Sequence, residues 1–128
     1  MASFKIKGDK ALIRRLKQIQ KEAPEAVEAG LYQEGLRAQE IGVPLTPLDI
    51  GTLRNSWYVA HPTRTRKGSQ VEIGVGGAAE DYAMVQHERL DFKHEVGGPK
   101  FVERALIAIQ PQFLRNLLAA ARAYLGKK

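Results

Sequence analysis

The sequence predicts an α+β fold, in which an N-terminal helical region and a kinked C-terminal helix pack on a small antiparallel β-sheet. Near both ends of the chain, apolar residues recur every three or four positions, which is the spacing of an amphipathic helix. The middle of the chain contains short apolar and polar alternations that are typical of half-buried strands. The 128 residues fit a single domain, 1–128.

The N-terminal region combines a short strand with a long helical stretch. Residues 4–7 alternate apolar and basic side chains, which indicates a strand with one buried face. Leu16 and Ile19 belong to the apolar stripe of a helix that follows. Pro24 either kinks this helix or opens a second one, because proline is tolerated in the first turn of a helix but not in its interior. The helical pattern stops near Gly42.

The middle of the chain predicts a β-hairpin with a polar tip. Residues 55–61 include an aromatic, strand-favouring run, and residues 71–75 alternate apolar and polar side chains as its return strand. Residues 82–87 indicate a short helical or irregular segment. Residues 61–70 and 87–98 are polar, and we expect them to be mobile loops.

The C-terminal region predicts one long helix with a kink. Pro99 suits its first turn, Pro111 removes a backbone hydrogen bond and should bend it, and Gly126 ends it. Its apolar stripe consists of Val102, Leu106, Ile109, Phe113, Leu117, Ala120 and Tyr124.

The charge is basic but distributed. The net charge is +6, with seven basic and two acidic residues in 1–22, three basic residues in 61–68, and six basic and one acidic in 100–128. Arg64, Arg66 and Lys67 at the hairpin tip are the candidate DNA-facing residues, although a charged tip also serves solubility. Interleaved aromatic residues and a helix-turn-helix pattern are both missing, so recognition of a base sequence is not expected.

The sequence contains no convincing catalytic, metal or cofactor site. The absence of cysteine excludes disulfides, cysteine-ligated zinc and thiol catalysis. A zinc-protease signature would need a histidine four residues after His87, where Asp91 stands. We therefore expect no enzyme, and expect this segment to contact a neighbouring subunit or partner through His87, Glu88, Arg89, Asp91, Phe92 and His94. A metal-dependent nuclease that uses His87, Glu88, Asp91 and His94 is the weaker alternative.

Residues 46–57 resemble a known signature. The pattern Pro-x-Asp-x-Gly-x-Leu-Arg-x-Ser occurs in a family of small tailed-bacteriophage neck or tail-completion proteins, and the chain matches it at Pro47, Asp49, Gly51, Leu53, Arg54 and Ser56. Two further elements of that family follow in the same order. They are Tyr82-Ala83 with Glu88 after it, and the segment 99–102 that leads into the last helix.

The signature residues are those of a structural corner rather than a catalytic site. Pro47 fixes its backbone φ angle, Asp49 can accept hydrogen bonds from following amides, and Gly51 tolerates a positive φ. We expect Leu53 to fill the core and Arg54 to pair with Asp49. Trp57, the only tryptophan, is expected in the core as well.

The resemblance implies a structural virion protein at the head–tail junction, assembled in the host bacterial cytoplasm. Its partners would be further copies of itself in a ring, neighbouring connector or tail proteins, and DNA that passes through the channel without sequence readout. No apolar run approaches the roughly 18–20 residues of a membrane span, so no membrane partner is expected. The alternative is a free, non-specific nucleic-acid-binding protein.

Overall fold

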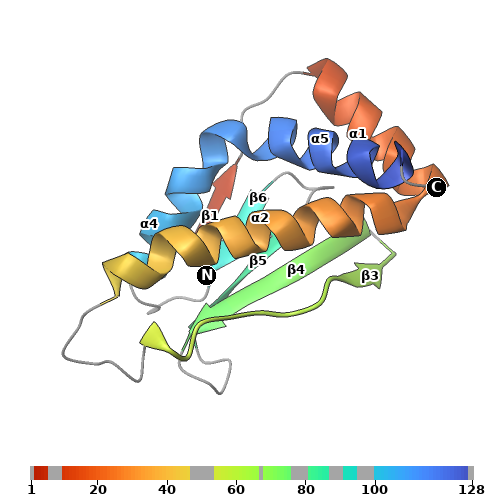
Figure 1. The fold of residues 1–128 in the computed structure, drawn as a ribbon. Helices are drawn as coiled ribbons and strands as arrows, with labels where there is room; N and C mark the ends of the chain where they lie inside the picture. The colour runs from red at the N-terminus through yellow and green to blue at the C-terminus, as the bar shows by residue number, and fades with distance from the viewer. Residues whose placement is uncertain are drawn as a thin grey trace.

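The computed structural model describes residues 2–5, 10–46, 54–66, 68–75, 81–86, 91–94 and 100–126. It confirms the α+β class, with helices from both ends of the chain covering an antiparallel sheet (Figure 1). Helix α2 (Pro24–Leu45) lies between the sheet and the C-terminal helices α4 (Lys100–Ile109) and α5 (Phe113–Gly126). Helix α1 (Lys10–Glu22) packs beside α2 and α5.

The sheet brings the N-terminal strand next to a strand from the second half of the chain. Its order is β1-β6-β5-β4-β2, with β3 also pairing with β4, and every pairing is antiparallel. The strands are β1 (Ala2–Lys5), β2 (Tyr58–Val59), β3 (Thr63–Thr65), β4 (Gly68–Val75), β5 (Asp81–Gln86) and β6 (Asp91–His94). The long strand β4 therefore holds β2 and β3 on one side and β5 on the other.

Three sequence-based assignments in this region are wrong. Residues 61–70, expected as a loop, contain β3 and the start of β4, with Thr63 opposite Gln70. Residues 81–86 form strand β5 rather than a helical or irregular segment, and residues 91–94 of the expected loop 87–98 form β6. The physical reason is that β5 pairs with strands on both sides, so the ladder compensates for weak local propensity.

Helix α2 is buried on two opposite faces, and a glycine lies at the contact on each of them. A Cβ atom at Gly30 would lie 2.7 Å from Leu117 Cδ1 of α5, and one at Gly35 would lie 2.7 Å from Val59 Cγ1 of β2. These glycines therefore allow close approach of the helix to both layers. Pro24 opens α2 rather than kinking a longer helix, and α2 continues past the expected end near Gly42 to Leu45.

The C-terminal helix is interrupted where Pro111 predicted a kink. A short 3-10 turn, η1 (Gln110–Gln112), separates α4 from α5, and α5 ends at Gly126. The Phe113 amide donates to the Gln110 carbonyl in this turn. Arg37 of α2 donates from Nη2 to the Ile109 carbonyl at 2.9 Å, so α2 also contacts the interruption.

The core lies where the three layers meet, and its fully buried side chains include Leu31, Ile73, Leu106 and Phe113. Within the described ranges, every helix is too short or too polar to cross a membrane.

Candidate nucleic-acid interface

The described part of the signature caps the end of α2. Arg54 donates from Nε to the Thr46 carbonyl at 2.7 Å and from Nη2 to the Pro44 carbonyl at 3.1 Å. Trp57 is 7% exposed and donates from Nε1 to Thr46 Oγ1 at 2.8 Å. The last carbonyls of a helix have no partner within the helix, so a guanidinium placed there stabilises the helix end.

The expected pairing of Arg54 with Asp49 stays a prediction, because Asp49 lies outside the described residues. Both described donors of Arg54 are directed to backbone carbonyls at the end of α2. Pro47, Asp49, Gly51 and Leu53 lie outside the described residues. The described signature side chains therefore contribute to the fold by holding the end of α2.

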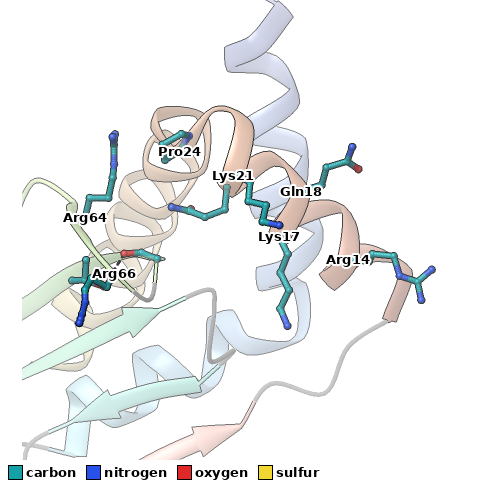
Figure 2. Close-up of a pocket in the computed structure, with 10 residues that line it drawn as sticks. Arg14, Lys17, Gln18, Lys21, Pro24, Arg64 and Arg66 are labelled. Atoms are coloured by element: carbon teal, nitrogen blue, oxygen red, sulfur yellow. Dashed lines mark hydrogen bonds between the residues drawn. The ribbon is translucent and has the colours of Figure 1, made fainter.

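A basic groove with a volume of about 730 Å³ lies between α1 and the β3–β4 hairpin. Among the described residues that line it, five are cationic and none is acidic; the cationic residues are Arg14, Lys17, Lys21, Arg64 and Arg66. Figure 2 shows Arg14, Lys17 and Lys21 on α1, with Arg64 and Arg66 on the hairpin. A concave surface lined by one sign of charge concentrates the electrostatic field and attracts anions.

The spacing of the cations on α1 explains why they share one side of the helix. Positions 14, 17 and 21 are separated by three and four residues, which places them on one face. Leu16 and Ile19 on the opposite side are buried in the core. Packing of that apolar side therefore orients the cationic side toward the hairpin.

Arg64 is held by Glu28 of α2. Its Nε and Nη2 atoms donate to the two carboxylate oxygens of Glu28 at 2.9 and 3.0 Å. Ser69 Oγ also donates to Glu28 at 2.6 Å and accepts from Gln20 Nε2 at 3.1 Å. This network joins α1, α2 and the hairpin, and so fixes the two walls of the basic groove relative to each other.

The same network shifts the pKa of Glu28. The hydrogen bond from Arg64 is the main cause that lowers the pKa of this carboxyl; burial opposes it, and the hydrogen bond from Ser69 and the charge of Arg64 lower it further. The Glu28 side chain is 17% exposed, whereas that of Arg64 is 54% exposed. Folding thus favours the ionised form of Glu28.

The sequence predicted only the residues on the hairpin side of the basic groove. Arg64 and Arg66 line the basic groove, and Lys67 lies outside the described residues. Arg14, Lys17 and Lys21 were not expected to face DNA, although their periodicity was readable in the sequence. Periodicity shows that they share a face but does not show which part of the fold that face meets.

Only part of the segment expected to contact a neighbour or partner is described by the structure. His87, Glu88 and Arg89 lie outside the described residues. Asp91, Phe92 and His94 belong to β6, which pairs with β5 on one side and β1 on the other, so the backbone there is an interior strand rather than a loop. Tyr82 and Ala83 of the resemblance lie on β5, opposite Gly74 and Ile73.

Among the residues that the structure describes, no three histidine or carboxylate side chains gather as a metal site would require. Comparison with protein-family models, curated proteins and solved structures finds no match to this chain. The phage resemblance therefore stays a prediction from the motif residues.

Replacing Glu28 by glutamine should reduce stability in a pH-dependent way. A lowered carboxyl pKa stabilises the fold fully above the ordinary value of 4.5, and this stabilisation is lost as pH falls through the folded pKa. We expect a lower urea midpoint than wild type at about pH 7, and a smaller difference at about pH 3. Glu40→Gln, at an exposed position of the same helix, is the matched control. An equal loss at both pH values would show that the Glu28 charge is not its source.

Proposed function

We propose that this chain is a structural subunit of the head–tail connector, neck or tail-completion ring of a tailed phage, surrounding the channel through which DNA passes. The observation that carries the proposal is the corner formed by Thr46, Arg54 and Trp57. These residues of the resembling segment hold the end of α2, as a structural signature requires.

The fold offers surfaces suited to repeated packing. Among the described strands, β1 pairs with β6 alone, so its other backbone edge is open to a strand from a neighbouring molecule. A head-to-tail contact repeated by rotation closes into a ring when the angle permits. In such a ring the basic groove would be repeated around the axis, which suits contact with DNA regardless of its sequence.

The second candidate function is non-specific nucleic-acid binding by a free protein. The basic groove favours it, because phosphate contacts alone are sufficient for sequence-independent binding. The two functions differ in assembly: the ring requires a closed oligomer or co-assembly with connector proteins, whereas a free binding protein requires neither.

Assembly tests the proposal directly. Native mass spectrometry and light scattering should detect a closed ring of one stoichiometry, either in the purified protein or after mixing with connector and tail proteins of the same phage. Electron microscopy of assembled particles should then locate the subunit at the head–tail junction. The same mixtures without this chain are the control. Protein that stays monomeric in every mixture would contradict the ring.

A further inference from the structure

We propose that the basic groove binds the phosphodiester backbone of duplex DNA, with Arg14, Lys17, Lys21 and Arg66 as the phosphate ligands. Arg64, the fifth cation of the groove, positions the hairpin instead. The inference rests on the proposed function only in naming duplex DNA as the polyanion. The shape of the groove, the exposure of its cationic side chains and their lack of partners among the described residues support the choice of phosphate ligands.

The four proposed ligands are available for an external anion. All four side chains are exposed. In the described part of the chain, none of them has an ion pair or a hydrogen bond to another residue, whereas Arg64 has both. Like charges gathered around one cavity repel one another, and a bound polyanion relieves this repulsion.

The length of the cationic row fits a phosphate backbone. From residue 14 to residue 21, α1 rises by about 10 Å. Each strand of duplex DNA carries one phosphate per about 3.4 Å along the axis, so this row spans about three phosphates of one strand. Arg66 lines the same groove from the hairpin (Figure 2).

Arg64 is excluded as a primary ligand by its pairing with Glu28. Both carboxylate oxygens of Glu28 accept from its guanidinium, so its charge is matched inside the protein. The guanidinium fork that would bind a phosphate in two places is already occupied. Its function is to hold the hairpin, and with it Arg66, across from α1.

An acidic segment of a second copy is a less suitable occupant. The surface carboxylates of the described residues, such as Glu22, Glu40 and Glu103, are distributed over three helices. A phosphate backbone offers the regular row of negative charge that the groove matches.

The experiment measures fluorescence anisotropy of a short labelled DNA duplex at several salt concentrations. For the full chain we expect binding that does not depend on base sequence. The double variant Lys17→Gln/Lys21→Gln should bind about tenfold more weakly or worse at roughly 0.1 M salt, and the slope of log K against log salt should fall by about two. The matched control is Arg104→Gln/Arg115→Gln, which removes the same charge from exposed positions on α4 and α5.

A second pair of variants tests the assignment of Arg64. Glu28→Gln releases Arg64 and should raise DNA affinity more than Glu40→Gln, which changes the net charge equally from the distant part of α2. An increase no larger than that of Glu40→Gln would show that Arg64 is not withheld from DNA by Glu28.

Two outcomes would overturn the groove as a DNA site. Equal losses for the two double variants would mean that distributed charge, rather than the groove, binds DNA. Displacement of DNA by poly-glutamate of matched charge, with equal potency, would assign the groove to an acidic protein segment. Assembly is measured separately, so a chain that binds DNA through the groove without forming a ring keeps this inference and removes the proposed ring.

Discussion

Replacing Glu34 by alanine should destabilise the protein by about 2–3 kcal/mol, because the partly buried Arg37 and Asn116 side chains lose their buried acceptor. Glu34 is 4% exposed between α2 and α5. Its carboxylate accepts from Arg37 Nε and Nη2 at 3.1 and 2.7 Å, and from Asn116 Nδ2 at 3.3 Å. Arg37 also donates to the carbonyl of Ile109, so the same cluster secures the break between α4 and α5. Urea unfolding followed by circular dichroism measures the loss.

Two variants separate the ion pair from general effects on α2. Glu40→Ala removes an exposed carboxylate from the same helix and should change stability by less than about 0.5 kcal/mol. Glu34→Ala combined with Arg37→Met removes both charges, so it should be less destabilising than Glu34→Ala alone. If Glu34→Ala cost no more than Glu40→Ala, the cluster would not hold the helices together.

Replacing Trp57 by alanine should cost about 3–5 kcal/mol, since it empties a large space in the core and releases the end of α2. The indole ring packs so closely on α2 that a Cβ atom at Gly42 would overlap it. It also lies against Phe101 of α4, with ring centroids 6.1 Å apart. Thermal and urea unfolding followed by circular dichroism measure the effect, because the variant lacks the only tryptophan fluorophore.

Trp57→Phe distinguishes ring packing from the hydrogen bond. Phenylalanine keeps much of the apolar volume but cannot donate to Thr46 Oγ1. The Thr46 hydroxyl still donates to the Gly42 carbonyl at 3.0 Å, so it keeps one partner. We expect a loss of about 1–2 kcal/mol for this variant. A loss as large as that of Trp57→Ala would assign the effect to the hydrogen bond rather than to the volume of the ring.

The sequence predicted those features that are encoded by neighbouring residues. The stripe containing Leu16 and Ile19 predicted α1, and Pro111 predicted the break between α4 and α5. The aromatic and β-branched composition around Trp57 predicted a buried residue there. These predictions succeed because helix periodicity and the missing amide of proline act within a few residues.

The strand pairings could not be predicted from neighbouring residues alone. Residues 91–94 resemble a polar loop, yet they form β6 between β5 and β1. Strand β1 comes from the other end of the chain, so no window of neighbouring residues contains both members of that pair. Backbone pairing across the sheet depends on chain segments that meet only after folding.

For the candidate site too, some features could be predicted from the sequence and others required the tertiary structure. By itself, the sequence determined an α+β chain with a basic surface, a basic hairpin tip and a row of cations on one face of its first helix. Only the tertiary structure decided that this row and Arg66 line one groove, that Glu28 holds Arg64, and that Arg54 caps α2. Charge and periodicity are properties of the sequence, whereas a groove or an ion pair between distant residues exists only once packing has brought its members together.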